Sequence, residues 1–225
     1  MRKRRFATLV ALAVAALAAS QASPGRHPLS GREYAWPMGV AGAPWLDRAE
    51  REAEEQPTRA LQIMQITPGM AVADIGAGSG YFTERLARLV GPTGRVFATD
   101  IQQGMIDLLK RRLSAERIQN VTVILGEPSN PRLPAGTIDL ALMVDVYHEL
   151  GAPQTVLGHI RTALKPGGRL VLVEYKGEDP TIPILPSHKM TVAQAKIEVE
   201  AEGFVMTTAN SSLPRQHVLI FTKVK

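Results

Sequence analysis

The sequence predicts a doubly wound α/β domain, in which helices cover both faces of a mostly parallel sheet. Short apolar runs alternate with amphipathic segments, the pattern of strand and helix units joined by right-handed crossovers. A glycine-rich turn, Asp74-Ile-Gly-Ala-Gly-Ser-Gly-Tyr-Phe82, follows an apolar run and opens a helix, where such sheets bind ligands. The 225 residues, 45% of them hydrophobic, suffice for one sizeable core.

The elements around this turn follow from local patterns. Before it, a charged run at 47–55 predicts a solvated helix face, and the apolar residues 61–64 predict a helix packed beside the first strand. After it, apolar spacing predicts helices over 82–90 and 103–115. Further strands are expected at 95–99, 121–125 and 140–144.

The end of the chain predicts a helix followed by a hairpin. Thr191 and Gln194 form the pattern of a helix cap, and Gly203 ends the helix. Residues 204–211 and 217–223 then predict a closing pair of antiparallel strands.

The glycine turn distinguishes between two adenosine cofactors. In the dinucleotide fingerprint G-x-G-x-x-G, the position that Tyr81 occupies here would be glycine, so a nicotinamide cofactor is disfavoured. Asp74, two residues before Gly76, suits a ligand with an ammonium group, such as the amino acid end of S-adenosylmethionine. Asp100, at the end of the second strand, can accept hydrogen bonds from both ribose hydroxyls of either cofactor.

With these positions the chain resembles the class I S-adenosylmethionine-dependent methyltransferases, of the small-molecule type that includes the ubiquinone and menaquinone C-methyltransferases. The resemblance covers roughly residues 45–225. It rests on Val72-Ala-Asp-Ile-Gly-Ala-Gly-Ser-Gly80, Asp100, the approach Leu133-Pro to Ile138-Asp139, and Leu164-Lys-Pro-Gly-Gly-Arg-Leu-Val-Leu-Val-Glu174. It implies a Rossmann-like sheet of seven strands in the order 3-2-1-4-5-7-6, with the last strand antiparallel.

The resemblance also implies which residues bind the cofactor. Asp74, Gly76, Gly78 and Gly80 would hold the methionine end, Asp100 the ribose, Glu127 the region of the adenine amino group and Asp145 the mouth of the site. At position 127 the family more often has an aspartate followed by a small residue. Here Pro128 follows, which removes a backbone donor that would otherwise face the adenine.

The segment Asp145-Val-Tyr-His-Glu149 carries the candidate catalytic groups. His148 is predicted to act as a base on the acceptor, and Tyr147 to position it. The alternative for both is a structural role, because alignment and a dry pocket can accelerate methyl transfer without a base. No metal site is expected, since the chain has no cysteine and its five histidines lack close metal-ligand spacing.

The charge distribution argues against nucleic acid as a substrate. Four of the 26 basic residues lie within positions 2–5, and the rest of the chain carries 22 basic and 21 acidic residues. A nearly neutral body lacks the basic surface that phosphate backbones require. We therefore expect a small-molecule acceptor; the oligomeric state is not predicted.

The first 22 residues have the three parts of a secretory signal peptide: the basic start, the apolar run 6–19 and the cleavage pattern Ser20-Gln21-Ala22. Fourteen apolar residues fall short of a bilayer span, so a cleaved leader and a periplasmic protein are expected, with an uncleaved anchor as the alternative. Residues 23–45 are predicted to be an extended arm or linker, with three aromatic residues that suit a lid, and 46–225 the main domain.

The sequence thus predicts an enzyme that transfers a methyl group from S-adenosylmethionine to the oxygen or carbon of a small, apolar or amphipathic acceptor. One alternative is a noncatalytic protein that binds S-adenosylmethionine or adenosine. A nicotinamide-dependent oxidoreductase is the other, and the glycine spacing disfavours it.

Overall fold

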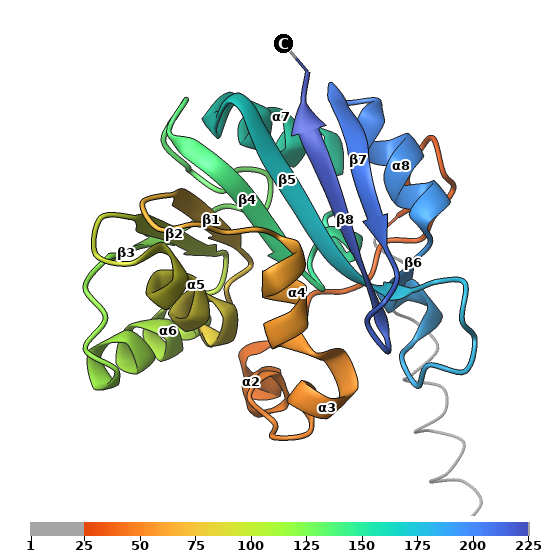
Figure 1. Cartoon of the computed structure of the whole chain (residues 1–225). Helices are drawn as coiled ribbons and strands as arrows, with labels where there is room; N and C mark the ends of the chain where they lie inside the picture. Colours follow the sequence, from red (N-terminus) through yellow and green to blue (C-terminus); the bar gives the residue numbers. More distant parts are fainter. Residues whose placement is uncertain (1–24, 225) are drawn as a thin grey trace, which may run out of the picture.

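The structure of the protein, a computed structural model, describes residues 25–224. The predicted signal peptide lies outside the described residues. The sheet has the order β3-β2-β1-β4-β5-β8-β7, with β6 paired to β5 (Figure 1). Its strands are β1 (Ala71–Ile75), β2 (Arg95–Asp100), β3 (Val121–Leu125), β4 (Ile138–Val144), β5 (Leu164–Lys176), β6 (Lys189–Met190), β7 (Phe204–Asn210) and β8 (Gln216–Lys223).

The sheet confirms the predicted topology. Strands β1 to β5 pair in parallel, and β8 inserts antiparallel between β5 and β7, so the seven main strands follow the order 3-2-1-4-5-7-6. The two-residue strand β6 is an addition that the sequence did not predict. Because the parallel strands end at one edge, the loops after β1, β2 and β4 lie together there.

Helices cover both faces of the sheet (Figure 1). One face packs against α4 (Pro57–Ile63) and α5 (Tyr81–Val90), with α6 (Gln103–Ala115) beside them at β2 and β3. The other face packs against α7 (Pro153–Ala163) and α8 (Val192–Glu200). Short helical turns complete the list of elements: η1 (Val40–Gly42), α2 (Ala43–Leu46), α3 (Arg51–Glu55), η2 (Tyr147–Glu149) and η3 (Pro186–His188).

The arm that precedes the domain is docked on it. Arg32 is buried and forms two hydrogen bonds with the carboxylate of Glu198 on α8, at 3.1 and 3.0 Å. The amide of Ala35 donates to the carbonyl of His148. Residues 25–39 of the predicted linker thus form an arm held against α8 and η2, and residues 40–45 form η1 and the start of α2.

The charged helix α3 is only partly the solvated face that the sequence suggested, because Glu52 and Ala53 are exposed but Arg51 and Glu55 are buried. Arg51 and Glu55 are 3% and 1% exposed, because they turn inward toward the end of β4. In the described part of the chain, no helix has the length and apolar character needed to cross a membrane.

Candidate active site

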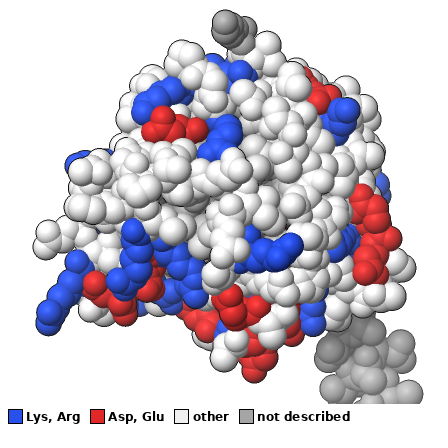
Figure 2. Space-filling model, in the orientation of Figure 1, with Lys and Arg blue, Asp and Glu red and all other residues white. Residues whose placement is uncertain are grey.

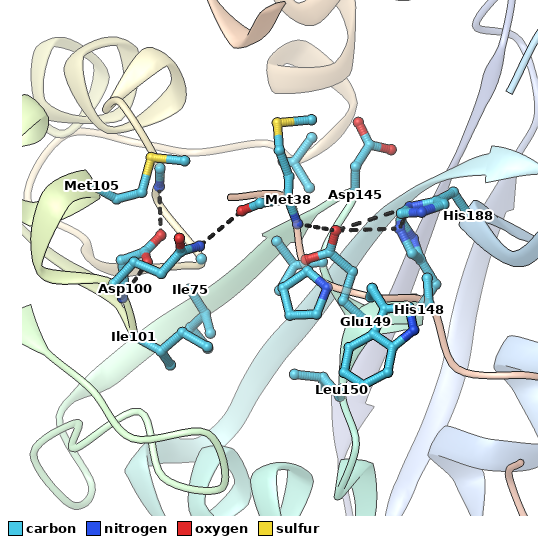
Figure 3. Close-up of a pocket in the computed structure, with 18 of the residues that line it drawn as sticks. Met38, Ile75, Asp100, Ile101, Met105, Asp145, His148, Glu149, Leu150 and His188 are labelled. Carbon is cyan, nitrogen blue, oxygen red and sulfur yellow. Dashed lines mark hydrogen bonds and ion pairs between the residues drawn. The ribbon is translucent and has the colours of Figure 1, made fainter. Parts of the chain in front are cut away.

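A cavity of about 630 Å³ lies at the carboxyl edge of the sheet, within the range of roughly 300–1,000 Å³ typical of small-molecule sites. The loops after β1, β2 and β4 form its floor, and the arm and η3 contribute its walls (Figure 3). Four large apolar residues that line it are also exposed to solvent: Trp36, Trp45, Ile101 and Leu185. The cavity therefore has an apolar rim.

The glycine turn forms one wall of the cavity. Gly76 and Gly78 have φ angles of +71° and +54°, which side chains disfavour. A Cβ on Gly76 would lie 2.5 Å from a methyl carbon of Val146, so a larger residue would also displace the loop after β4. Gly76 and Gly78 thus expose backbone atoms to the cavity without side chains, which allows the close approach that an adenosine cofactor requires.

Asp100 lies beside this turn at the end of β2. Its Oδ2 accepts a hydrogen bond from the amide of Gly78 at 3.0 Å, and its Oδ1 accepts one from the amide of Gln102 at 2.9 Å. Burial raises the pKa of Asp100, and these backbone donors oppose that shift. Each carboxylate oxygen keeps a lone pair for a ligand, so the group suits a pair of ribose hydroxyls.

Three of the predicted site residues do not line the cavity: Asp74, Gly80 and Tyr147. Asp74 is buried under the glycine turn, where its Oδ2 accepts a hydrogen bond from the hydroxyl of Thr83 at 2.6 Å. Gly80 begins α5 and faces Leu109. These two residues shape the turn, and the structure does not place them where they would contact the methionine end directly.

Tyr147 requires a similar correction. Its side chain is fully buried in the core cluster that includes α7 and α8, with the guanidinium of Arg32 5.5 Å from its ring centroid. Successive residues of the turn η2 point in different directions, so Tyr147 faces the core while His148 faces the cavity. The structure therefore gives Tyr147 a packing role and not the predicted contact with an acceptor.

The burial of Asp74 under the glycine turn can be tested by the pH dependence of the protein's stability. Burial raises its pKa from 3.8 to about 6, so the folded protein binds this proton more tightly than the unfolded chain. Stability from this group is present at low pH and lost as the pH rises from about 4 to 6. Two pKa units correspond to roughly 3 kcal/mol. We expect Asp74→Asn, which has the shape of the protonated acid, to unfold at higher urea concentration than the wild type at pH 8.

The same measurement near pH 4 serves as the control for Asp74→Asn. The wild-type and variant proteins should then have similar free energies of unfolding, because both carry a neutral group at this position. A difference that stays constant between pH 4 and 8 would contradict the assignment of a buried, titrating carboxyl group.

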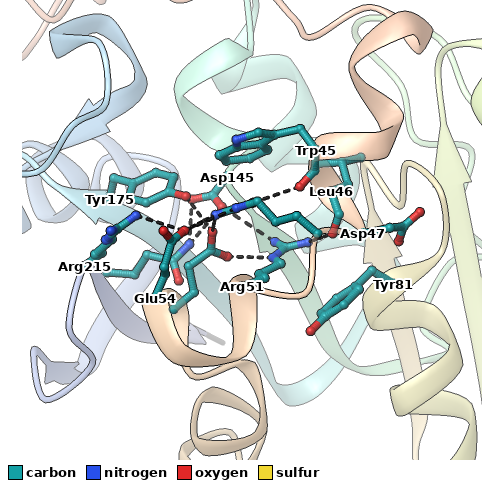
Figure 4. Close-up of polar contacts among 12 residues, drawn as sticks. Trp45, Leu46, Asp47, Arg51, Glu54, Tyr81, Asp145, Tyr175 and Arg215 are labelled. Atoms are coloured by element: carbon teal, nitrogen blue, oxygen red, sulfur yellow. Dashed lines mark hydrogen bonds and ion pairs between the residues drawn. The ribbon is translucent and has the colours of Figure 1, made fainter.

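Asp145 lies in a network of buried charges at the mouth of the cavity (Figure 4). Gln216 donates to both of its carboxylate oxygens, at 2.9 and 2.8 Å, and Arg51 lies 3.9 Å away. Burial, followed by the charges of Glu55 and Glu174, raises the pKa of Asp145 to about 8. Arg51 also lines the cavity, so the network presents a cation as well as an acid to a ligand.

Sequence reasoning missed most of this network. Tyr175 on β5 donates its hydroxyl to Glu55 at 2.7 Å, and Arg48 stacks on Trp45 at 3.8 Å while it also pairs with Glu55. The only signal in the sequence was the charged run at 47–55, which is also typical of a solvated helix.

His148 is the predicted catalytic residue that does line the cavity. Its Nδ1 lies 2.5 Å from Oε2 of the fully buried Glu174, and its Nε2 lies 3.1 Å from Nδ1 of His188 (Figure 3). Burial lowers the pKa of His148, but the carboxylates of Glu174, Glu149 and Asp145 together outweigh burial, and the net pKa is raised. Burial and the charge of His148 lower the pKa of His188.

Glu149 lies next to these histidines, and Glu127 lies on the opposite side of the site. The amide of Met38 donates to Glu149 at 3.3 Å, and burial raises the pKa of Glu149 to about 7. Glu127 lines the cavity but is exposed and pairs with Arg132. Of the predicted cofactor residues, the cavity lining thus includes Gly76, Gly78, Asp100, Glu127 and Asp145.

Comparison with known proteins agrees with the fold and the glycine turn. Residues 72–168 match the model of a family described as a methyltransferase domain. A crystal structure of a SAM-dependent methyltransferase from Aquifex aeolicus superposes with a TM-score of 0.79, at 23% identity, over 84% of this chain and 100% of that one. The fold is that of the class I S-adenosylmethionine-dependent methyltransferases.

The chain is also similar in sequence to quinone methyltransferases. A demethylmenaquinone methyltransferase from Lactococcus lactis is 31% identical over 116 residues, 52% of this chain and 45% of the relative. The ubiquinone/menaquinone C-methyltransferase UbiE of Hydrogenovibrio crunogenus is 32% identical over 117 residues, 52% of this chain and 46% of the relative. The chain thus spans less than half the length of these relatives. Residues 72–168 thus match a methyltransferase domain, and the fold around them is that of S-adenosylmethionine-dependent methyltransferases.

Proposed function

We propose that this protein transfers the methyl group of S-adenosylmethionine to a small, apolar or amphipathic acceptor at oxygen or carbon. The observation that carries the proposal is the cavity itself, which joins the glycine turn and Asp100 at one end to His148 and His188 at the other. The sulfonium methyl is already reactive, so a cavity that aligns it with an acceptor and excludes water supplies much of the acceleration.

The residues of the first end fit the cofactor. Asp100 would hold the ribose hydroxyls, and the backbone of Gly76 and Gly78 would lie against the methionine end. Arg51 and Asp145 offer a cation and an acid near the same turn, which suits the carboxylate and ammonium groups of an amino acid. Glu127 would face the adenine from the exposed side.

The other end fits an apolar acceptor with one polar atom. Trp36 and Leu185 form an apolar rim there, and His148 presents Nε2 to the cavity while Glu174 holds Nδ1. If the acceptor is a hydroxyl, its proton would pass to Nε2 as the methyl arrives, and S-adenosylhomocysteine would leave as a neutral thioether. The buried carboxylate behind the ring stabilises the imidazolium that forms.

The surface also fits a small-molecule acceptor. Basic and acidic side chains lie interspersed over the face drawn in Figure 2, and that face has no continuous basic surface of the kind a phosphate backbone requires. The first 22 residues support the further proposal that the protein is exported.

The proposal is tested by binding and by transfer. We expect S-adenosylmethionine and S-adenosylhomocysteine to bind the full chain with one site in calorimetry, and NAD not to compete. Tritiated S-adenosylmethionine should then label apolar phenols and quinols in preference to hydrophilic amines. Binding without transfer to any member of such a panel would favour a noncatalytic protein, and competition by NAD would contradict the cofactor assignment.

A rim variant tests the acceptor end separately. Leu185 is 67% exposed, so Leu185→Asp should not disturb folding, but it places a charge where an apolar acceptor would be buried. We expect its KM for the acceptor to rise by about tenfold, because covering a leucine contributes roughly 1.5–3 kcal/mol. The affinity for S-adenosylmethionine should not change. Ile197→Asp, on the exposed face of α8 and outside the cavity lining, is the matched control.

A further inference from the structure

Three side chains at the acceptor end of the cavity form a set of metal-ligand type. Among the described residues, His148, Glu149 and His188 each offer one ligand atom, and these atoms lie within 4.8 Å of one another. Nε2 of His148 is 3.1 Å from Nδ1 of His188, and Oε1 of Glu149 is 4.0 and 3.9 Å from these nitrogens. All three residues line the cavity.

These separations are close to those of ligands around one cation. Imidazole nitrogens bind zinc at about 2.0–2.1 Å, which places two of them roughly 2.8–3.4 Å apart for right-angled or tetrahedral geometry. The two histidine nitrogens already have this separation. The carboxylate oxygen of Glu149 would need to move closer to both nitrogens by less than about 1 Å to reach the separation of two zinc ligands.

The groups behind the three side chains are an independent observation. Glu174 is fully buried, and in the tautomer with an unprotonated Nε2 it accepts a hydrogen bond from Nδ1–H of His148 at 2.5 Å. In that tautomer Nε2 accepts from Nδ1–H of His188 at 3.1 Å, and a cation bound between the two nitrogens would replace this hydrogen bond. The other oxygen of Glu174 accepts from the amide of Tyr147 at 2.9 Å, so its orientation is fixed. Histidines that bind metals almost always donate their second ring N–H to such a partner.

The arm supports the third ligand in the same way. The amide of Met38 donates to Oε1 of Glu149, and the amide of Ala35 donates to the carbonyl of His148. Carboxylate ligands are commonly held by hydrogen bonds of this kind. The arm therefore lines the cavity, orients the side chain of Glu149 and holds the backbone of His148.

We propose that His148, Glu149 and His188 form a site for a divalent transition-metal cation, facing the acceptor. Two imidazoles and one carboxylate favour zinc or a similar transition metal over magnesium or calcium, which prefer oxygen ligands. The remaining coordination positions face the cavity, as in sites where a metal binds a substrate. This departs from the expectation drawn from sequence spacing, because His148 and His188 are 40 residues apart in the chain.

The role of the cation rests on the proposed function, whereas the site itself does not. A cation would bind the oxygen of an acceptor hydroxyl or enol and lower its pKa, so that its proton passes to solvent. The acceptor oxygen, or the carbon conjugated to it, then forms the bond to the methyl group as the carbon–sulfur bond breaks. In that state Nε2 of His148 is a ligand and does not take the proton.

The test is a titration of the full chain in the absence of S-adenosylmethionine, after treatment with a chelator and its removal. We expect one equivalent of Zn²⁺ to bind and to raise the melting temperature, and Co²⁺ to give a visible spectrum of a nitrogen and oxygen site. Mg²⁺ at the same concentration should do neither. A wild-type protein that binds no Zn²⁺ would overturn the proposal.

The variants identify the ligands. His188→Ala should weaken Zn²⁺ binding by at least tenfold and remove the rise in melting temperature; the residue is only half buried on η3, so the metal-free protein should remain folded. Glu149→Gln should also weaken binding, although its amide oxygen can still accept from Met38. His159→Ala, at an exposed position of α7, is the matched control and should bind as the wild type does.

Two results separate this proposal from the proposed function. If the wild type binds Zn²⁺ and His188→Ala does not, the metal site is supported even if no acceptor is ever methylated. Equal Zn²⁺ affinity in His188→Ala and His159→Ala overturns the site and leaves methyl transfer, with His148 as the base, unaffected.

Discussion

Replacing Arg32 with methionine is expected to lower the free energy of unfolding by roughly 3–5 kcal/mol, because it leaves the carboxylate of Glu198 buried without its cation. Arg32 binds both oxygens of Glu198, and the two side chains are 3% and 0% exposed. A third hydrogen bond, from Nη1 of Arg32 to the carbonyl of His148 at 3.0 Å, joins the pair to the active site. Urea unfolding at equilibrium measures the loss.

Two further variants distinguish a buried ion pair from ordinary packing. In Arg32→Met with Glu198→Leu, both charges are removed, and most of the lost stability should return, because apolar pairs often replace buried ion pairs without cost. Arg26→Met removes an exposed pair with Glu33 on the same arm and should cost less than about 1 kcal/mol. If the double variant were as unstable as Arg32→Met, the penalty of an unpaired charge would not be the cause.

The fold was predictable because its signals are local. The periods of apolar residues at 103–115 and 121–125 coincide with α6 and β3, and the cap at Thr191 is present in the structure with both of its hydrogen bonds. The glycine turn and Asp100 were also recognisable, since each depends on a few residues at the end of one strand. In these segments the local preference of the sequence agrees with the global fold.

The docked arm and the network around Asp145 were less predictable because their contacts join distant parts of the chain. Arg32 and Glu198 are 166 residues apart, and nothing in either local pattern indicates the other. Arg51 and Glu55 have the spacing of an exposed helix pair, which is also the spacing of a buried one. Only the position of Asp145 and Tyr175 opposite them makes the network buried.

Neighbours in sequence can also have opposite environments. Tyr147 and His148 are adjacent in one turn, yet the first packs in the core and the second lines the cavity. The sequence supplied the segment that carries the chemistry, but the direction of each side chain depends on the turn η2, whose backbone could not be inferred from residue types.

Replacing Asp100 with asparagine is expected to weaken S-adenosylmethionine binding by roughly 100-fold or more. The carboxylate would accept two hydrogen bonds from the ribose, and hydrogen bonds to a charged group contribute about 1.5–3 kcal/mol each. Asparagine has a single acceptor oxygen, so it also loses one of the two bonds to the amides of Gly78 and Gln102. Calorimetry with the cofactor measures the loss.

Asp107→Asn is the matched control for Asp100→Asn. It makes the same substitution at an exposed position of the neighbouring helix α6, where Asp107 only accepts a hydrogen bond from Gln103. Its affinity for S-adenosylmethionine should not change. If Asp100→Asn keeps the wild-type melting temperature and binds the cofactor within tenfold of the wild type, the ribose is not held at the end of β2. Because Asp100 also accepts from the amide of Gly78, the melting temperature must be measured as well. Loss of binding in Asp100→Asn at an unchanged melting temperature, with wild-type binding in Asp107→Asn, would place the ribose at the end of β2.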